Sequence, residues 1–353
     1  MTIKMIILIL TQALNNQSID LLEAALQKQY FGHEIKKLEI NENVSVIDDK
    51  LVRKIPLPYG KVEYEIIPLE QLALVIKRTW GPIRTYALKI CKALEQQGVP
   101  LLNNCDFVEW SHSKITQSET LNANLLPPTR CYRWADLEEE KFTPDVNAFP
   151  CIIKLDRGTR GDGVYRADSP KSLVTTLDSI KQKHANDSEC ILGKGILIQS
   201  FIPTNADISV SDYYRINLVN GQPQSAVRFQ LFWVPADDGA DWYKLQDNPD
   251  NDDEEAVDVN DTTLFPPDQL NKIISACPCQ DGVVGIDIVR DREGNLFLLE
   301  YNDGPNISQI YELGNADGSA AEKACFSFPD AHAICCGLRL DQEICVIMNS
   351  SKI

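Results

Sequence analysis

Two carboxylates and an amide oxygen, those of Asp287, Glu300 and Asn302, occur close together in the C-terminal part of the chain. A hard cation such as Mg²⁺ binds oxygen ligands, commonly a few carboxylates together with substrate phosphates. If the three groups share one face of the folded chain, they can hold such a cation. The polar, half-solvated face of an ordinary hairpin explains the same pattern and stays open as an alternative.

The two segments that carry these groups predict a β-hairpin, because each alternates apolar and polar residues and a turn-forming run separates them. If Arg290 pairs with Phe297, Asp287 lies opposite Glu300. Asn302, two residues further on, then points to the same side. The opposite side is expected to face a core with the side chains of Ile286, Ile288, Leu299 and Tyr301.

A second group of candidate residues surrounds Lys154, which lies inside the apolar segment Cys151–Leu155. A buried ammonium group without a partner is very costly. Gly158, Gly161 and Gly163 follow, and such a loop lets backbone amides approach an anion closely. Together these features indicate a polyphosphate site, although the order is neither that of a Walker loop nor that of a dinucleotide fold. A glycine-rich turn beside a snorkelling lysine remains the alternative.

A third feature is the apolar segment Leu197–Ile202, which contains Gln199 and Phe201. An apolar strand that ends at a linker between two lobes can form the wall of an adenine pocket and read the base edge with its backbone. Taken alone, the segment does not differ from an ordinary buried strand.

Composition narrows the class of protein. The chain has 353 residues, of which 44% are hydrophobic, and this predicts two or three domains. A net charge of −17 makes nucleic acid and anionic membranes poor partners. The run Met5–Leu10 is too short to span a membrane and is expected to be a buried strand. Eleven cysteines without a spaced framework indicate a reduced, cytoplasmic protein.

The elements that must position these residues follow two patterns. Strands over 4–11, 34–40, 72–77 and 99–102 alternate with helices over 19–29 and 82–97, which predicts an α/β domain with a doubly wound parallel sheet. The later part predicts antiparallel sheets with helices, an α+β pattern. Its expected strands are 151–155, 164–167, 195–202, 212–219 and 224–232, and its expected helices are 114–124 and 172–184.

Acidic residues dominate the segment 236–261, which contains a single basic residue, Lys244. Such a segment is typical of a solvated, mobile surface loop. A gate that attracts a cationic substrate is the alternative. After Gly318 the tail carries no interpretable motif.

Arg78 is a further candidate, because it follows a buried strand of the predicted parallel sheet. Open α/β sheets bind ligands at the carboxyl ends of their strands. We therefore expect Arg78 to contact substrate, with a structural salt bridge as an equal alternative.

In chain order, these features resemble the ATP-grasp superfamily, and within it the chain is similar to the RimK-type ligases, which add amino acids to carboxylates. The resemblance covers roughly Lys4 to Tyr311 and rests on the whole series, because no single motif is highly specific. The matching positions are Lys154, the glycines of 158–163, the segment from Gln199, Arg215, Arg228, Asp287, Glu300 and Asn302.

The resemblance assigns a role to each matching residue. The nucleotide-binding residues that it implies are Lys114, Lys154, Gly158, Gly161, Gly163, Gln199, Phe201 and Ile202. The implied ligands of Mg²⁺, or of Mn²⁺, are Asp287, Glu300 and Asn302. The implied catalytic residues are Lys154 and Arg228, which would face the phosphates, and Arg215, which would hold the acyl phosphate or the substrate carboxylate.

The resemblance also implies a division of the chain. Residues 1–110 would form an N-terminal pre-ATP-grasp domain, followed by a two-lobed ATP-grasp domain. Its small lobe would span 111–202, and its C-terminal lobe would span 203–315 and include the acidic insertion 236–261. The tail 316–353 has no implied role.

The implied reaction is an ATP- and Mg²⁺-dependent carboxylate–amine ligation. A substrate carboxylate attacks the γ-phosphate to give an acyl phosphate and ADP, and an amine then displaces phosphate to form an amide. The expected substrates are an amino acid or a peptide or protein carboxylate, and a homodimer is common in the families that the chain resembles. Alternatives are a non-catalytic ATP-binding or scaffolding module, an ATP-grasp kinase, and an acidic interaction protein without nucleotide.

The chain departs from the family pattern at several positions. Ser113 replaces the usual Asp before Lys114, and one residue is inserted between Asp212 and Arg215. Ser200 stands where Glu is common, and the sequence after Asn302 differs. The acidic insertion replaces a short basic segment. These differences leave the nucleotide site intact and put the acceptor pocket in doubt.

Overall fold

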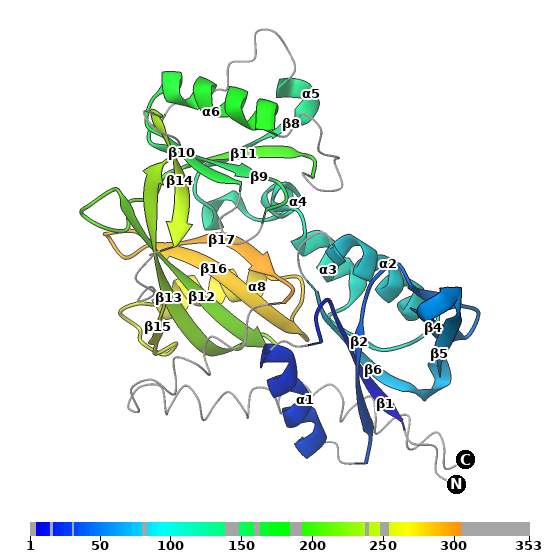
Figure 1. Ribbon diagram of the computed structural model, residues 1–353. Helices are drawn as coiled ribbons and strands as arrows, with labels where there is room; N and C mark the ends of the chain where they lie inside the picture. The colour runs from blue at the N-terminus through cyan, green and yellow to red at the C-terminus, as the bar shows by residue number, and fades with distance from the viewer. Residues whose placement is uncertain are drawn as a thin grey trace.

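The structure is a computed structural model in which an N-terminal α/β region is followed by a larger two-lobed region (Figure 1). Both contribute to the candidate site. The residues that the structure describes are 5–14, 17–29, 32–79, 83–137, 148–158, 163–183, 193–236, 240–247 and 254–304. Within these ranges, none of the helices combines the length and the apolarity needed to cross a bilayer.

The N-terminal region is built on a parallel sheet with the strand order β2-β1-β6-β7. Its strands are β1 (Ile6–Thr11), β2 (Glu34–Glu39), β6 (Leu72–Arg78) and β7 (Leu101–Leu102). The helices α1 (Gln17–Gln29) and α2 (Ile83–Gln96) pack into two different hydrophobic cores on its two faces. Every residue of β1 is buried, as expected for a central parallel strand. The predicted doubly wound sheet is confirmed.

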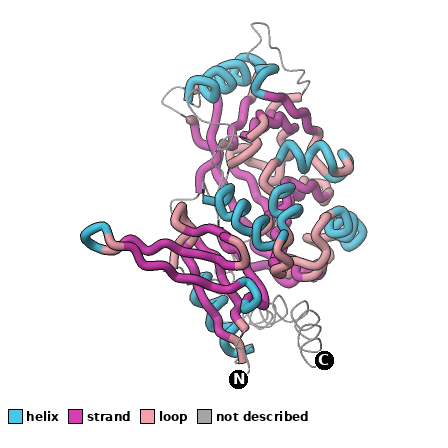
Figure 2. Tube along the Cα trace, turned by 90° about the vertical axis from the view of Figure 1, so that its right-hand side faces the viewer, coloured by secondary structure: helices cyan, strands magenta, loops and turns pink. Residues whose placement is uncertain are grey.

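A three-stranded antiparallel ribbon leaves this region between β2 and β6. It consists of β3 (Val44–Ile47), β4 (Lys50–Pro56) and β5 (Val62–Pro68), with the short 3₁₀ helix η1 (Pro58–Gly60) at its tip and η2 (Leu69–Gln71) at its end. Figure 2 shows β4 and β5 projecting well away from the body of the molecule.

The small lobe follows a pair of short helices, α3 (Cys105–Ser111) and α4 (Lys114–Thr120), and the 3₁₀ helix η3 (Ala123–Leu125). Helix α6 covers one face of its antiparallel strands and leaves the other face toward the C-terminal lobe (Figure 1). Its elements are β8 (Thr129–Arg133), α5 (Trp134–Leu137), β9 (Cys151–Leu155), β10 (Val164–Ala167), α6 (Pro170–Lys183) and β11 (Gly195–Ser200).

The C-terminal lobe continues the same sheet through long antiparallel strands. They are β12 (Val210–Val219), β13 (Gln222–Pro235), β16 (Val283–Arg290) and β17 (Leu296–Asn302). Helix α8 (Pro267–Ala276) packs on one face and closes a core around Tyr301. The opposite face is therefore free to carry polar side chains toward the small lobe. A tight turn at Asn220 and Gly221, with φ of 48° and 70°, joins β12 to β13.

Part of the acidic segment 236–261 forms strands, so the expectation of a loop is wrong there. Strand β14 (Trp242–Asp247) pairs with both β13 and β10, and β15 (Glu254–Val257) pairs with β13. Trp242 is buried and packs edge-on against Tyr165, which fixes β14 in spite of its acidic neighbours. The other acidic positions at 237–239 and 248–253 lie outside the described residues, as does the tail after Gly304.

Candidate nucleotide and metal site

The hairpin of β16 and β17 places Asp287 directly opposite Glu300 and Gly285 opposite Asn302. Directly paired residues share a face, and so do residues two apart on one strand. The predicted grouping of the two carboxylates and the amide is therefore confirmed.

The register between this site and the turn differs from the prediction by one residue. Arg290 pairs with Leu296, so the expected pairing with Phe297 is wrong. A β-bulge after Asp287 absorbs the difference. It also makes Leu298, and not Leu299, the residue that is buried in the core.

Cationic side chains pair with both carboxylates on this face. Arg215 donates from Nε and Nη2 to the two oxygens of Asp287 at 2.7 Å each, a bidentate pair. Lys114 Nζ lies 3.1 Å from Glu300 Oε2. Asn302 Nδ2 donates to Asp287 Oδ2 at 3.1 Å, which leaves its amide oxygen available as a ligand.

The two carboxylates differ in their protonation equilibria. Burial raises the pKa of Glu300, but the ammonium groups of Lys114 and Lys154 outweigh it and lower that pKa to about 2. For Asp287, burial has the larger effect and raises the pKa, while the Arg215 guanidinium opposes the shift. A divalent cation favours the ionised form of both groups and would stabilise the pair of carboxylates.

Lys154 faces the hairpin from the small lobe. It pairs with Val164 and Leu197 on the two neighbouring strands, on the sheet face that α6 does not cover. Burial lowers the pKa of Lys154 to about 8, and the negative charge of Glu300 opposes this shift. Coulomb interactions decay with distance, so this coupling places the Lys154 ammonium near the acidic side chains of the other lobe.

Lys114 joins the two lobes at the first residue of α4. Its ammonium donates to Gly158 O at 3.0 Å in addition to its contact with Glu300. Ser113 caps the helix by accepting from Thr116 N, so the serine that replaces the family's Asp has a clear local role.

Asp156 is a positioning residue that the sequence reasoning missed. It is fully buried, and its Oδ1 accepts from Ser113 Oγ at 2.7 Å and from Ile115 N at 2.9 Å. Its Oδ2 accepts from Lys194 N at 2.7 Å. These bonds fix the start of α4 and therefore Lys114. Its partners are distant in the sequence, so no local signal indicates this role.

The glycine-rich loop begins and ends at described residues, whereas Gly161 lies outside them. Gly163 has φ of +78°, and a Cβ there would approach the Leu155 side chain to 2.7 Å. Only glycine fits this position without strain. The carbonyl of Gly163 accepts from Leu155 N at 2.9 Å, which fixes the end of the loop beside the strand that carries Lys154.

The predicted adenine segment lies on the same face of the small lobe as Lys154. Gln199 pairs with Ile152, and its amide donates to Thr129 Oγ1 at 2.8 Å. Phe201 packs edge-on against the Trp233 ring, with 6.4 Å between centroids, and Ile202 follows half-buried. An apolar wall with a fixed backbone therefore stands beside Lys154.

The structure contradicts the expected position of Arg228. Arg228 pairs with Tyr214, the neighbour of Arg215, and therefore points to the opposite face of the sheet. There it contacts Asp212 at 2.9 Å and Glu255 at 3.2 Å. Because of the inserted residue, Asp212 and Arg215 are three positions apart and lie on opposite faces of the strand. Asp212 therefore pairs with Arg228 and does not face the site.

Asn217 is a second residue that the sequence reasoning missed. It lies two residues after Arg215 on the same face and pairs with Gly285, which itself pairs with Asn302. Its Nδ2 donates to Ser225 Oγ at 3.1 Å, whereas its buried Oδ1 has no hydrogen-bond partner among the described residues. The alternation from Arg215 to Asn217 within an apolar strand was the available signal.

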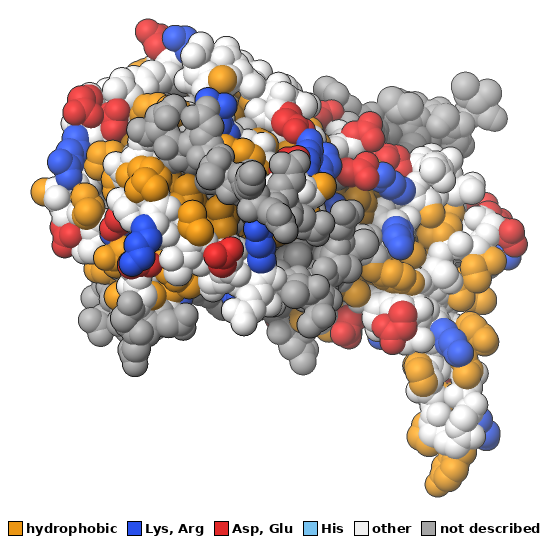
Figure 3. All heavy atoms as spheres, turned by 90° about the horizontal axis from the view of Figure 1, so that it is seen from above, with side chains coloured by type: hydrophobic (Ala, Val, Ile, Leu, Met, Phe, Trp, Pro, Cys, Tyr) orange, Lys and Arg blue, Asp and Glu red, His pale blue; other side chains and the backbone are white. Residues whose placement is uncertain are grey.

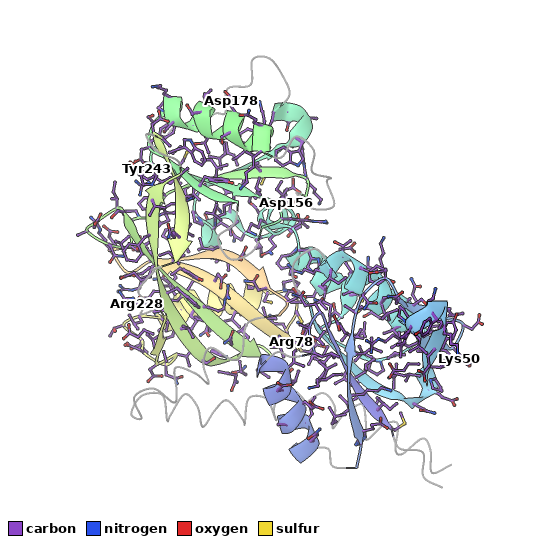
Figure 4. All side chains as sticks on the ribbon, viewed as in Figure 1. Lys50, Arg78, Asp156, Asp178, Arg228 and Tyr243 are labelled. Atoms are coloured by element: carbon purple, nitrogen blue, oxygen red, sulfur yellow. The ribbon has the colours of Figure 1, made fainter. Side chains whose placement is uncertain are left out.

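The N-terminal region meets the end of the β16–β17 hairpin. Asp303, directly after Asn302, forms a buried ion pair with Lys77 at 2.7 Å and contacts Arg84. The guanidinium of Arg78 lies near Gly304, since a Cβ on that glycine would be 3.7 Å from it. Figure 4 shows Arg78 where the N-terminal sheet approaches the C-terminal lobe. The carboxyl end of β6 is therefore beside the site, as expected from the sheet topology.

The oxygen donors of this face suit a Mg²⁺ ion that is bound together with a nucleotide. In the described parts of the chain, no three His, Cys, Asp or Glu side chains gather to hold a metal by themselves. Asp287, Glu300 and Asn302 instead gather a few oxygen atoms on one face, a set that could hold Mg²⁺ together with phosphate oxygens, which is how Mg²⁺ is usually held.

Known proteins resemble this chain in sequence and in fold. No protein-family model matches the chain. A probable alpha-L-glutamate ligase of Legionella pneumophila is 27% identical over 249 residues, which is 70% of this chain and 74% of the relative.

Solved structures share the fold. D-cycloserine synthetase DcsG matches with a TM-score of 0.57 and 13% identity, over 92% of this chain and 99% of that one. D-alanine–D-alanine ligase from Bacillus anthracis, complexed with ATP, matches with a TM-score of 0.56 and 14% identity, over 93% and 97%. The chain therefore shares the fold of these ligases, and its sequence is similar to a probable alpha-L-glutamate ligase, in agreement with the resemblance to the ATP-grasp and RimK-type ligases noted above.

Proposed function

We propose that this protein is an ATP- and Mg²⁺-dependent carboxylate–amine ligase that acts through an acyl phosphate. The observation that carries the proposal is the meeting of two lobes at one site. Lys154 comes from the small lobe and Lys114 from helix α4 just before it, and Lys114 contacts Glu300 of the C-terminal hairpin at 3.1 Å. A nucleotide triphosphate between these elements would find cations on one side and metal ligands on the other.

The side chains have separate tasks in the proposed reaction. Lys114 and Lys154 bind the phosphates and neutralise the charge that develops on them during transfer. The loop that begins at Gly158 covers the phosphates and excludes water, which would hydrolyse the intermediate. Mg²⁺, when bound to Asp287, Glu300 and Asn302, supplies Lewis-acid stabilisation of the phosphate oxygens.

Arg215 holds the acyl phosphate or the substrate carboxylate in this proposal, and Asn217 contributes its free carbonyl oxygen as an acceptor for the amine. Arg215 is already bound to Asp287 by two hydrogen bonds, so its guanidinium is oriented beside the metal ligands. Arg228 has no part in the reaction, because it lies on the other face.

The substrates proposed are an amino acid or a peptide or protein carboxylate together with an amino group. Arg78 is the residue proposed to contact the substrate from the N-terminal region, because it lies near Gly304 at the end of the β16–β17 hairpin. A cytoplasmic location stays a prediction.

The experiment that tests the function is ADP release with Mg-ATP against amino acids and candidate peptides, followed by mass measurement of the product. A product that gains the mass of the amine minus water supports the proposal. ADP release without an amide would identify a kinase, and Mg-ATP binding without ADP release under any condition would identify a non-catalytic binding module.

The matched variant is Asp287→Asn with Glu300→Gln, with folding checked by circular dichroism. It is expected to lose ADP release by at least about 100-fold, as for removal of a charge-stabilising group. A folded double variant that releases ADP at the parent rate would show that these residues are not the metal ligands.

A further inference from the structure

The ribbon of β3, β4 and β5 carries most of the exposed large hydrophobic side chains in the described chain. Six of the eight such side chains belong to it. They are Ile47, Leu57, Tyr59, Val62, Tyr64 and Ile66, with Tyr59 at 100%, Tyr64 at 58% and Ile66 at 54% exposure. Monomeric proteins rarely expose contiguous apolar patches without an interaction to cover them.

The pairing register divides the ribbon into two different faces. One face holds Val44, Leu51 and Ile67, which pack into the core of the N-terminal region. Toward the tip, the same side carries Glu65, which pairs with Lys36 and Arg53. This face is therefore accounted for by contacts within the chain.

The other face is apolar and turned outward. Val52 pairs with Ile66, Lys54 with Tyr64, and Pro56 with Val62, so all six side chains point to the same side. Ile47 joins them through its pairing with Lys50. We call these seven positions and Lys50 the outer face of the ribbon. Figure 3 shows the projection at lower right, with hydrophobic side chains along it.

The tip presents an aromatic ring at a conformational cost. Tyr59 has φ of +62° and Gly60 has φ of +72°. The left-handed region is unfavourable for a non-glycine residue, and a fully exposed tyrosine gains nothing from its own chain in return. A contact made outside the monomer explains this arrangement.

Charge identifies the kind of partner. The chain has a net charge of −17, so two copies of it repel each other. The ribbon 44–68, in contrast, has four acidic and four basic residues and is neutral. The acidic residues are Asp48, Asp49, Glu63 and Glu65, and the basic residues are Lys50, Arg53, Lys54 and Lys61. The projecting ribbon is thus a place where two copies can meet with little repulsion.

The charges are also arranged to complement themselves. Asp48 and Asp49 lie in the turn at one end of the outer face, and Lys61 lies at the tip, with all three exposed. If two outer faces pack antiparallel, the acidic turn of each copy lies over the basic tip of the other, and the apolar residues meet between these ends, alongside Lys54. Isologous contacts of this kind generate closed two-fold dimers.

We infer that the outer face of the ribbon is a homodimer interface in which two copies pack face to face and antiparallel. The outer face offers eight positions, fewer than the roughly 20–30 residues per side of a standard interface, so the dimer is expected to be weak and to dissociate on dilution. This inference does not rest on the proposed ligase chemistry, because the ribbon contains none of the site residues.

Sedimentation equilibrium of the full chain tests the inference. We expect a reversible monomer–dimer equilibrium for the parent. Ile66→Glu and Tyr59→Glu should each raise the dissociation constant at least about tenfold, because they put a charge into an apolar contact. Val174→Glu is the matched control, since Val174 is 49% exposed on α6, away from the ribbon, and this variant should associate like the parent.

A charge exchange tests the antiparallel arrangement. Lys61→Glu should weaken association about tenfold by facing the acidic turn of the other copy, and the double variant Asp49→Lys with Lys61→Glu should restore it to within about threefold. A parent chain that stays monomeric up to about 1 mM, or ribbon variants that dimerise like Val174→Glu, would overturn the inference. Failure of the exchange to restore association would overturn the antiparallel packing.

Discussion

At the scale of single residues, the site consists of charged side chains whose positions and pKa values depend on burial and on the ion pairs between them. Lys154 is the most informative of them. It is half-buried in the small-lobe sheet, where desolvation lowers its pKa to about 8 and the charge of Glu300 opposes the shift. If Lys154 binds phosphate as proposed, a pKa of about 8 means that it loses its charge within an accessible range of pH.

The affinity for Mg-ATP should therefore fall as the pH rises above about 8. The free protein releases the Lys154 proton with a pKa of about 8, whereas bound phosphates favour the charged form, so above this pH binding must take up a proton. The apparent dissociation constant should rise about tenfold for each pH unit. Isothermal titration calorimetry in buffers of different ionisation enthalpy measures both the affinity and the proton uptake.

The control is Lys154→Arg, whose guanidinium stays charged over this range. Its affinity for Mg-ATP should be weaker but independent of pH between 7.5 and 9.5, approximately. An arginine variant with the same pH dependence as the parent would show that another group titrates.

Arg215 and Arg228, both implied to be catalytic by the resemblance, lie on opposite faces of the sheet. Arg215→Met should reduce ADP release by at least about 100-fold, since it removes a charge beside the reacting groups and leaves Asp287 without its partner. Arg228→Met should change the rate by less than about threefold, because its contacts are on the far face. Steady-state kinetics of both variants decide the matter, and equal losses would contradict the assignment of faces.

At the scale of elements, the strands β9 and β10 carry the residues proposed for the phosphate side of the site, and Gly163 stands directly before β10. Gly163 and Gly98 share a left-handed backbone, with φ of +78° and +80°. They differ in their surroundings. A Cβ at Gly163 would meet Leu155, whereas a Cβ at Gly98 would meet nothing within 4 Å.

Gly98→Ala should therefore lower the free energy of unfolding by about 1 kcal/mol through backbone strain alone. Gly163→Ala should lower it by more and should also raise the Michaelis constant for ATP, because Leu155 follows Lys154 in the same strand. Chemical denaturation and ATP kinetics separate the two effects. Equal losses of stability, with no change in the kinetics, would mean that the Leu155 contact has no consequence for the site.

Elements were also the scale at which the sequence was most informative. The alternation on two short strands was enough to place Asp287, Glu300 and Asn302 on one face, because the side-chain period of a strand is fixed at two. The bulge beyond Asp287 could not be foreseen, because one extra residue in a strand leaves no mark in the pattern.

Other errors have the same kind of physical cause. Arg228 was assigned to the wrong face because the match to the family took no account of the residue inserted before Arg215. That residue puts Asp212, the ion-pair partner of Arg228, on the face opposite to Arg215. Asp156 was missed because it binds Ser113, a residue that is distant in the sequence. The acidic composition around β14 concealed the buried Trp242, whose packing outweighs the local polarity.

At the scale of the whole molecule, a buried ion cluster joins the N-terminal region to the end of the β16–β17 hairpin. Asp303 forms ion pairs with Lys77 and Arg84 of that region. Burial alone would raise the pKa of Asp303, but the two positive charges outweigh it and lower that pKa. Lys77 and Asp303 are each only 4% exposed. The position of Asn302 thus depends on contacts between regions.

Asp303→Asn should destabilise the protein by about 3–5 kcal/mol, because it leaves buried cations without their counter-charge. Glu109→Gln is the matched control. It breaks the exposed pair with Lys92 at 2.7 Å, which should cost less than about 1 kcal/mol. Urea unfolding of the two variants measures the difference, and a comparably small loss for both would show that the cluster does not hold the regions together.

The most direct test of the whole account is the effect of Mg-ATP on the free energy of unfolding, compared between the parent and Glu300→Gln. Mg-ATP at a hundred times its dissociation constant should stabilise the parent by about 2.7 kcal/mol. The same concentration should add little to the variant, whose metal ligand and partner of Lys114 are lost. A parent that gains no stability from Mg-ATP, or a variant that gains as much as the parent, would contradict the claim that the nucleotide and its metal bind between the two lobes.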